Sequence, residues 1–222
     1  NMPGRLITFE GTEGSGKTTQ ISLLAERLRA QGHPVRTLRE PGGTAIGEEI
    51  RHTLKHSPAN HAMTPEAELL LMNASRAQLV REVIRPALAA GQIVLCDRYY
   101  DSTIAYQGYG RQLDLRMVQS LIEVAVGGTR PDLTLVFVVP QELSEARRRV
   151  RQPTLPLSLK RDRFEEADRA FFDRVAQGYQ ALAAAEPGRV RLLDATGKVA
   201  DIQAAIWDLV QPLLPGKGRP AG

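Results

Sequence analysis

A glycine-rich loop near the start of the chain constrains the fold more than any other feature. Residues 11–18 read GTEGSGKT and satisfy the pattern G-x-x-x-x-G-K-[ST], between the apolar run 6–9 and a helix-compatible stretch, 17–30. In such a loop, consecutive backbone N–H groups converge on phosphate, and the N-terminus of the helix adds partial positive charge. The sequence therefore predicts a nucleotide-phosphate site at the junction of a strand and a helix.

Five short apolar runs, rich in β-branched residues, recur at 6–9, 35–38, 93–96, 133–139 and 190–193. Segments of helical length separate or follow them, at 17–30, 65–89, 115–126, 142–150, 164–184 and 199–213. Strands that alternate with helices form parallel sheets covered on both faces. We predict an α/β fold of the P-loop NTPase type, with a five-stranded parallel sheet flanked by helices on both faces, as a single domain over 1–222.

Composition narrows the class of protein. The single cysteine, Cys96, excludes an internal disulfide framework and is typical of a reducing compartment, so we expect a cytoplasmic protein. No apolar run approaches the roughly 18 residues of a membrane span, and we expect no membrane partner. Residues 215–222 read as a disordered tail rich in glycine and proline. The net charge of +4 is spread among interspersed acidic and basic residues and decides nothing about partners. Because the sequence has no recognisable groove-reading or stacking element, we expect no nucleic-acid partner.

The chemistry of the loop assigns its residues. We expect the nucleotide to be bound by Gly11, Thr12, Glu13, Gly14, Ser15, Gly16, Lys17, Thr18 and Thr19. Lys17 would reach the β- and γ-phosphates, and Thr18 would ligate magnesium. Asp97 ends the apolar run 93–96, where P-loop proteins place a second magnesium-site carboxylate, and Arg98 follows it. An arginine beside that carboxylate suggests that a second phosphate, on an acceptor, comes close to the first.

The loop alone does not name the reaction, because GTPases, ATPase motors and kinases share it. The chain contains no N-K-x-D sequence for reading guanine, and it is too short for the second lobe of a motor. The stretch 147–163 holds six arginines and one lysine around Pro153 and Pro156, and it reads as a mobile basic lid of about 141–163. Two alternatives stay open: another small nucleotide or nucleoside kinase, and a nucleic-acid-binding ATPase.

Four further stretches narrow the choice: REPGGTAIGEEIR (39–51), ASRAQLV (74–80), DRYYDSTIAYQGYGR (97–111) and DRFEEADRAFFDRVAQGY (162–179). In this order behind the loop, they resemble the bacterial thymidylate kinase family over nearly the whole chain. The resemblance implies transfer of the γ-phosphoryl group of ATP to dTMP, giving dTDP and ADP. It also implies Mg²⁺ as cofactor and a homodimer.

The resemblance also names an acceptor site, which extends from a region of about 39–76. Its implied members are Glu13, Pro41, Arg51, Met72, Arg76, Arg98, Ser102, Thr103, Tyr106 and Gln107. Arg51 and Arg98 would hold the dTMP phosphate, and Arg76 would donate to a thymine carbonyl. Met72 stands where many members carry a phenylalanine that stacks on thymine, and its polarizable thioether can cover the same ring face.

Finer roles are implied for the third stretch and for the loop. Tyr106 would crowd the sugar C2′ and disfavour ribose, while Ser102 and Thr103 would lie at the base edge, with Gln107 beside them. Pro41 would lie close to the thymine.

Glu13 would turn toward the acceptor and accept a hydrogen bond from the deoxyribose 3′-hydroxyl. The loop then carries no arginine, and family members of this kind supply it from the lid. The implied catalytic residues are Lys17, Asp97, Arg98, Arg149, Arg151 and Arg161.

Overall fold

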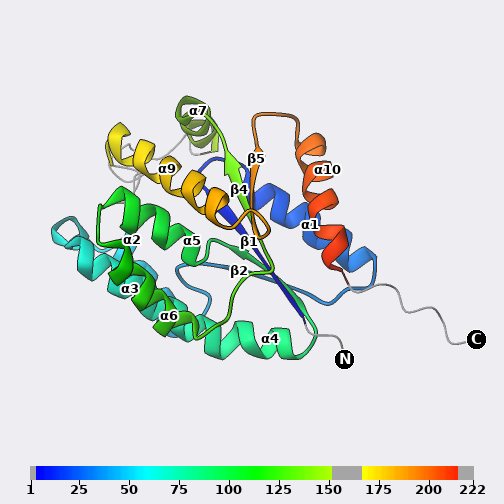
Figure 1. The fold of residues 1–222 in the computed structure, drawn as a ribbon, viewed down its shortest axis with the longest axis horizontal. Coiled ribbons are helices and arrows are strands. Elements are labelled where there is room, and N and C mark those ends of the chain that lie inside the picture. The colour runs from blue at the N-terminus through cyan, green and yellow to red at the C-terminus, as the bar shows by residue number, and fades with distance from the viewer. Residues whose placement is uncertain (1–3, 152–166, 215–222) are drawn as a thin grey trace, which may run out of the picture.

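The computed structural model describes residues 4–151 and 167–214, and a five-stranded parallel sheet forms its centre (Figure 1). Its strands are β1 (Arg5–Gly11), β2 (Val35–Arg39), β3 (Ile93–Asp97), β4 (Leu133–Val138) and β5 (Val190–Asp194). Their order across the sheet is β2-β3-β1-β4-β5. The five predicted strands are thus confirmed. With β1 between β3 and β4, the carboxyl ends of the strands form a crevice at the point where the winding reverses.

Side chains along β1 alternate between the two faces of the sheet. Ile7 and Phe9 face a core built with helix α1 (Lys17–Ala30) and helix α10 (Val199–Val210). Successive residues of a strand point to opposite faces, so Leu6, Thr8 and Glu10 face the other side, where all three are fully buried. Glu10 is therefore a carboxylate inside the protein, directly before the phosphate loop.

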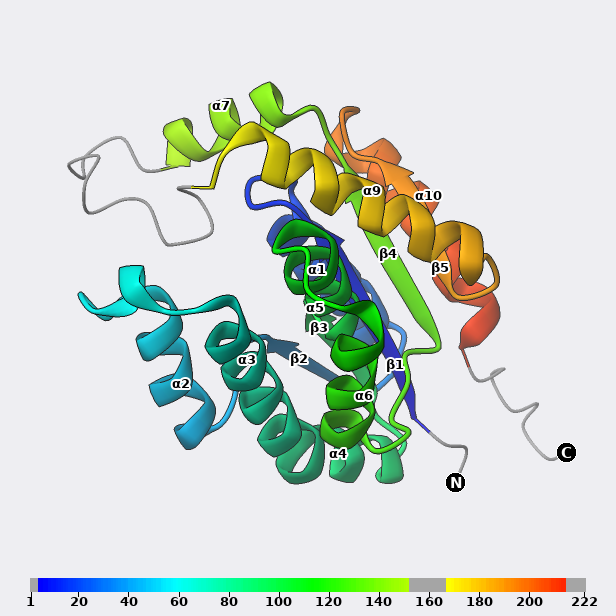
Figure 2. The same cartoon turned by 60° about the vertical axis from the view of Figure 1, so that its left-hand side comes forward.

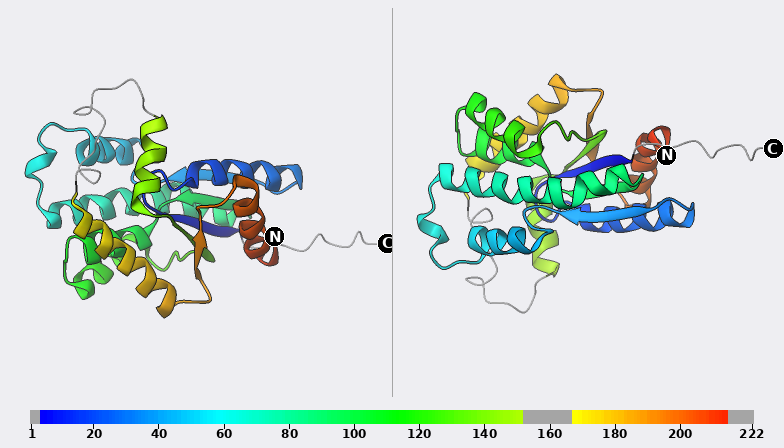
Figure 3. Two further views of the ribbon diagram at one scale, coloured as in Figure 1. Left: turned by 90° about the horizontal axis from the view of Figure 1, so that it is seen from above. Right: turned by 90° about the horizontal axis from the view of Figure 1, so that it is seen from below.

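The second face of the sheet is covered by a longer set of helical segments (Figures 2 and 3). These are α3 (Pro65–Leu79), η2 (Val80–Ile84), α4 (Arg85–Ala89), α5 (Tyr100–Thr103), η3 (Ile104–Gly110), α6 (Leu115–Val126) and α9 (Arg169–Ala185). Helix α2 (Ala45–Lys55) packs beside α3, and the short 3₁₀ turn η1 (Asn60–Ala62) connects the two. Thr64 caps α3 and Asp114 caps α6, because both side chains accept backbone N–H bonds from the first turn.

The helix predicted over 65–89 is interrupted by a turn of π-helix. Segment η2 is that turn, and α4 follows it with Pro86 near its start. A proline has no N–H to donate to the carbonyl four residues earlier, and its ring clashes with that carbonyl. The helix widens just before Pro86 and then resumes.

A second π-helix was not predicted at all. Segment η3 continues α5 without a break and carries Tyr106 and Gln107, both buried. Single π turns inside helices are frequent at functional sites because the extra residue re-aims the neighbouring side chains. No repeat or spacing in the sequence signals such a turn.

Several ends differ from the prediction. Helix α9 begins after Asp168, whose carboxylate accepts from Phe171 N at 2.8 Å, rather than at 164. Helix α10 ends at Val210, and Pro212 lies in the 3₁₀ turn η4 (Gln211–Leu213). The described part of the predicted lid is helix α7 (Gln141–Arg151), within one residue of the prediction. The rest of the lid and the predicted tail lie outside the described residues.

Among the described helices, none is both long enough and apolar enough to span a membrane.

Candidate active site

The phosphate loop turns sharply between β1 and α1. Gly14 and Gly16 have φ of 82° and 98°, a left-handed conformation that only glycine adopts without strain. Gly14 also has no room for a side chain, since a Cβ there would collide with the Ser144 carbonyl and lie 3.0 Å from Arg148 Cγ. Helix α7 is therefore packed directly on the phosphate loop.

Lys17 lies folded back over the loop. Its Nζ atom donates to Gly11 O at 2.9 Å and Thr12 O at 3.1 Å, and it lies 4.0 Å from Asp97 Oδ1. Burial and, to a smaller extent, the charge of Arg98 lower the pKa of Lys17 to about 8, against the opposing effect of Asp97. An incoming phosphate would replace the carbonyl partners and favour the charged ammonium.

The magnesium ligands expected from the sequence lie on either side of this lysine. Asp97 Oδ1 is enclosed and receives no hydrogen bond from the described residues. Thr18 is exposed in the first turn of α1, beside the loop. Carboxylate and hydroxyl oxygens are ligands that Mg²⁺ accepts, and a carboxylate oxygen without a donor suits a cation. The residues present therefore fit the metal that the sequence predicts.

A cavity opens beside the loop. Nine residues of the predicted acceptor site line it, namely Glu13, Pro41, Met72, Arg76, Arg98, Ser102, Thr103, Tyr106 and Gln107. Thr12 of the loop lines it as well. Six more were not predicted: Glu40, Lys55, Gln141, Ser144, Arg148 and Phe172. Arg51 is not among the residues that line the cavity, but its guanidinium donates to the carbonyl oxygen of Pro41, which is, at 2.9 Å.

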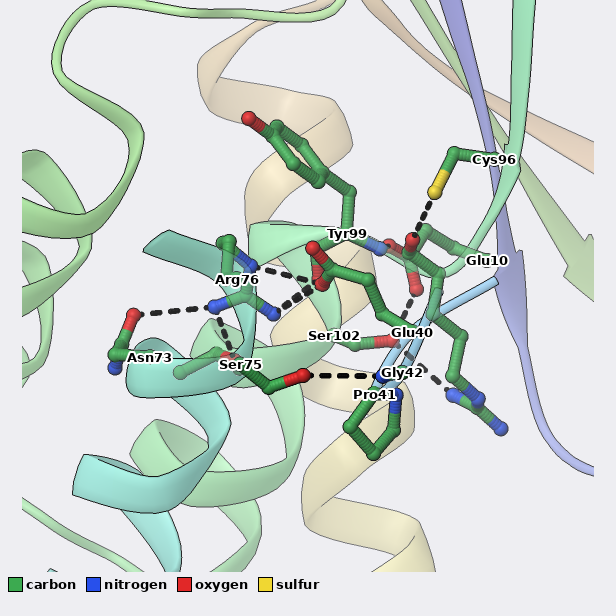
Figure 4. Close-up of polar contacts among 12 residues, drawn as sticks. Glu10, Glu40, Pro41, Gly42, Asn73, Ser75, Arg76, Cys96, Tyr99 and Ser102 are labelled. Carbon is green, nitrogen blue, oxygen red and sulfur yellow. Dashed lines mark hydrogen bonds and ion pairs between the residues drawn. The ribbon is translucent and has the colours of Figure 1, made fainter. Parts of the chain in front are cut away.

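Arg76 is fixed by a buried partner on the neighbouring loop (Figure 4). Its Nε donates to Glu40 Oε2 at 2.8 Å, and its NH2 group lies 2.7 Å from the same oxygen. The other N–H groups reach Asn73 Oδ1, Thr103 Oγ1 and the Tyr99 carbonyl at 3.0 to 3.2 Å. The guanidinium has five N–H donors. A thymine carbonyl would thus have to share or replace one of these bonds.

Glu10 joins three elements beneath the cavity. It accepts from Tyr99 N at 2.8 Å and Tyr179 Oη at 2.9 Å, and also from Ser102 Oγ. Burial and, to a smaller extent, the nearby charge of Asp101 raise the pKa of Glu10 to about 7, against the opposing effect of Arg98. Tyr179 belongs to α9, so this carboxylate ties the helix that follows the lid to the end of β1.

Arg98 is held in place by the hydrogen-bonded residues around Glu10. It has φ of 71°, which is uncommon for a non-glycine residue, and its N–H donates to Phe9 O at 2.9 Å. The guanidinium donates to Ser102 Oγ at 3.1 Å and lies over the Tyr106 ring, 5.0 Å from its centroid. Its position is therefore set by the chain of contacts from Glu10 through Ser102.

Three consecutive arginines of α7 face three directions. Arg147 donates to Ala195 O at 3.0 Å and to Ser15 O at 3.4 Å. Arg148 packs on Gly14 and lines the cavity. Arg149, a predicted catalytic residue, has a side chain that is 79% exposed and lies 3.6 Å from Glu145. The side chain of Arg151 and all of Arg161 lie outside the described part of the chain.

A second hollow lies between the loop, α7 and the start of α10. It is lined by Gly14, Ser15, Gly16, Thr19, Gln20, Ala146, Arg147, Val150, Gly197, Val199 and Ile202. Four of these were predicted to bind nucleotide. The loop between β5 and α10 contributes Gly197, which no motif had marked.

Comparison with known proteins decides the family. A sequence profile for thymidylate kinase matches residues 9–206. The chain belongs to the thymidylate kinase family. It is 50% identical to the thymidylate kinase of a Synechococcus strain over 209 residues, covering 94% of this chain and 95% of that one. It is 51% identical to that of Syntrophotalea carbinolica over 201 residues, with 90% and 92% covered.

A solved structure agrees with these relatives. The crystal structure of thymidylate kinase from Ehrlichia chaffeensis superposes with a TM-score of 0.74 at 31% identity, and covers 94% of this chain and 99% of that one. The P-loop fold and the family resemblance predicted from the sequence are both confirmed. The residues that the sequence missed include three buried carboxylates, Glu10, Glu40 and Glu68. Only Glu10 had a visible signal, as the one charge in the apolar run ITFEG.

Proposed function

We propose that this chain transfers the γ-phosphoryl group of ATP to dTMP, giving dTDP and ADP, with Mg²⁺. The observation that supports it most is the single cavity that joins Thr12 and Glu13 of the phosphate loop to Arg98 and to the polar side chains of η3. A cavity of this shape supports a reaction in which an acceptor phosphate lies beside the donor site. Membership of the family adds the nucleoside-monophosphate kinase class.

Charge neutralisation is the chain's main task in this reaction. Phosphoryl transfer needs aligned groups and positive charge, because the transition state spreads negative charge over the equatorial oxygens. In our proposal Lys17 holds the donor phosphates, and Arg98 and Arg51 hold the acceptor phosphate. The acceptor oxygen is already anionic near neutral pH, so no side chain serves as a strong base. Bound at Thr18 and Asp97, Mg²⁺ would supply further positive charge to the phosphates.

Arg148 is our candidate for the α7 arginine that lies between the two phosphates. It packs on Gly14 of the loop and lines the acceptor cavity, whereas Arg149 faces solvent. Arg151 and Arg161 stay candidates from the sequence alone. Glu13 lines the same cavity, in keeping with a hydrogen bond to the deoxyribose 3′-hydroxyl.

We also propose a homodimer formed through α3 and α6, which pack side by side. Leu70 on α3 is 54% exposed and Val124 on α6 is 73% exposed, and burying such side chains stabilises association. Light scattering should give twice the chain mass of 24.4 kDa. A mass near that of one chain would contradict this part of the proposal. A cytoplasmic location and a single domain stay predictions.

The activity is tested by measuring ADP release with ATP, Mg²⁺ and one acceptor at a time: dTMP, dUMP, dCMP, AMP or thymidine. We expect dTMP to give the highest kcat/KM. If thymidine but not dTMP were phosphorylated, the phosphate-binding roles of Arg51 and Arg98 would be wrong. Salt-dependent binding of DNA or RNA without consumption of dTMP would favour the ATPase alternative.

A further inference from the structure

The side-chain amide of Gln107 is held in one orientation by a buried carboxylate. Gln107 Nε2 donates to Glu68 Oε1 at 2.9 Å. Glu68, on α3, is fully buried, and Gln107, on η3, is 1% exposed. An ionised carboxylate only accepts hydrogen bonds, so the NH₂ group of Gln107 must face Glu68 and its carbonyl oxygen must point elsewhere.

Arg111 is the cationic partner of this carboxylate. Its Nε donates to Glu68 Oε1 at 3.2 Å and its NH2 group donates to Oε2 at 3.1 Å. The guanidinium lies over the Phe171 ring, 4.8 Å from the centroid, which fixes its own plane. A buried carboxylate without such a cation would be strongly disfavoured. The three side chains therefore form one rigid unit behind the cavity wall.

The other polar atom of the Gln107 side chain, Oε1, is a hydrogen-bond acceptor. Gln107 lines the acceptor cavity, and no described residue donates to its Oε1 atom. The cavity wall at this point therefore offers a carbonyl oxygen and no N–H.

We propose that Glu68, held by Arg111, is a positioning residue that makes this cavity select a base bearing a ring N–H. The inference rests on the proposed function and deepens it. Thymine carries N3–H between two carbonyl groups, and that N–H can donate to Gln107 Oε1. Cytosine presents a bare N3 lone pair, which would face the same oxygen without a proton between them. A site built to make a hydrogen bond rejects a base that cannot complete it, because its own polar group is left unpaired.

The decisive variant is Glu68→Gln, which keeps shape but supplies both a donor and an acceptor. The amide of Gln107 can then turn over and present NH₂ to the cavity. We expect the ratio of kcat/KM for dTMP to that for dCMP to fall by about tenfold or more, mainly through a higher KM for dTMP. The matched control is Glu66→Gln, an exposed carboxylate two residues earlier on the same helix, which should leave the ratio unchanged.

A rescue separates positioning from simple destabilisation. In the double variant Glu68→Gln/Gln107→Glu the carboxylate moves to the cavity side and again offers only acceptor oxygens to the base. We expect it to recover part of the preference for dTMP. An equal loss for dTMP and dCMP in Glu68→Gln, or no recovery in the double variant, would overturn the proposal.

The unsubstituted chain provides a test that does not depend on folding of a variant. It should prefer dTMP over dCMP by about a thousandfold or more, as hydrogen-bond selection in an enclosed site allows. Comparable turnover of the two nucleotides would overturn the inference while leaving the kinase activity standing. Absence of dTMP turnover would overturn the proposed function instead.

Discussion

The two halves of the site are built in different ways. The donor half consists of consecutive residues, 11–19, whose backbone groups and one lysine face the phosphates. The acceptor half gathers side chains from segments far apart in the chain. Its polar side chains are aimed by buried carboxylates, such as Glu40 behind Arg76 and Glu10 behind Ser102. Backbone groups recognise phosphate by local conformation, whereas recognition of a base needs side chains fixed from behind.

This contrast predicts different failures in the two halves. A change in the donor half should remove turnover with every acceptor. A change in the acceptor half should alter preference among acceptors, KM or pH behaviour more than it alters the chemical step.

The largest effect is expected from Lys17→Ala. The variant removes the ammonium that would contact the β- and γ-phosphates, and we expect kcat to fall by about a thousandfold or more with dTMP and dUMP alike. ADP release measures the rate, and circular dichroism checks the fold. A near-normal kcat would contradict the assignment of the loop.

The second-largest effect is expected at Arg148, with the neighbouring Arg149 as a control. Arg148→Ala should lower kcat by about a hundredfold, because the side chain between the loop and the acceptor cavity is lost. Arg149→Ala is the matched control and should change kcat by less than about twofold, since its side chain faces solvent. The reverse order would move the chemistry to the outer face of α7.

A smaller effect is expected at Tyr106. Its ring lies edge-on to Phe171 in the acceptor cavity, so Tyr106→Ala opens space beside the sugar. The preference for dTMP over its ribose counterpart should fall by about tenfold. Tyr106→Phe keeps the ring and should keep the preference. Unchanged discrimination in the alanine variant would show that the ring does not read the sugar.

The smallest effect concerns stability. The pKa of Glu10 is about 7 in the folded chain and ordinary in the unfolded chain. Between pH 4.5 and 7 the folded state binds the extra proton, so the free energy of unfolding should decrease as pH rises through this range. We expect Glu10→Gln to remove a slope of about 1 kcal/mol per pH unit, measured by urea denaturation. Parallel pH profiles for the two proteins would refute the assignment.

The contrast between the donor half and the acceptor half also explains which features could be predicted from the sequence. The loop, Asp97 and the five strands depend on contiguous residues or on short periodicities, and each was found where expected. The family resemblance supplied the cavity residues such as Arg76 and Gln107. Neither the local sequence patterns nor the family resemblance identified Glu68 or Tyr179. Their hydrogen-bond partners, Gln107 and Glu10, lie 39 and 169 positions away. A buried carboxylate has no local pattern; only the tertiary fold shows what it holds.

The arginine of α7 shows the same limit. From the sequence, Arg147, Arg148 and Arg149 are equivalent members of one basic run, of which the sequence prediction names Arg149. Successive residues of a helix point about 100° apart, so the choice depends on how the helix is rotated over the loop. That rotation is set by the contact with Gly14, which lies 134 positions before Arg148.

The close packing of α7 on Gly14 also bears on how this enzyme family could diversify. Arginine placed in the loop and arginine placed in the lid are alternative solutions to one electrostatic problem. Here an arginine at position 14 would meet the Ser144 carbonyl and the stem of Arg148 at once, on a backbone with positive φ. A lineage with this arrangement cannot exchange one solution for the other through single neutral substitutions. The helix would have to shift first, so we expect variants that carry only one of the two changes to be poorly active.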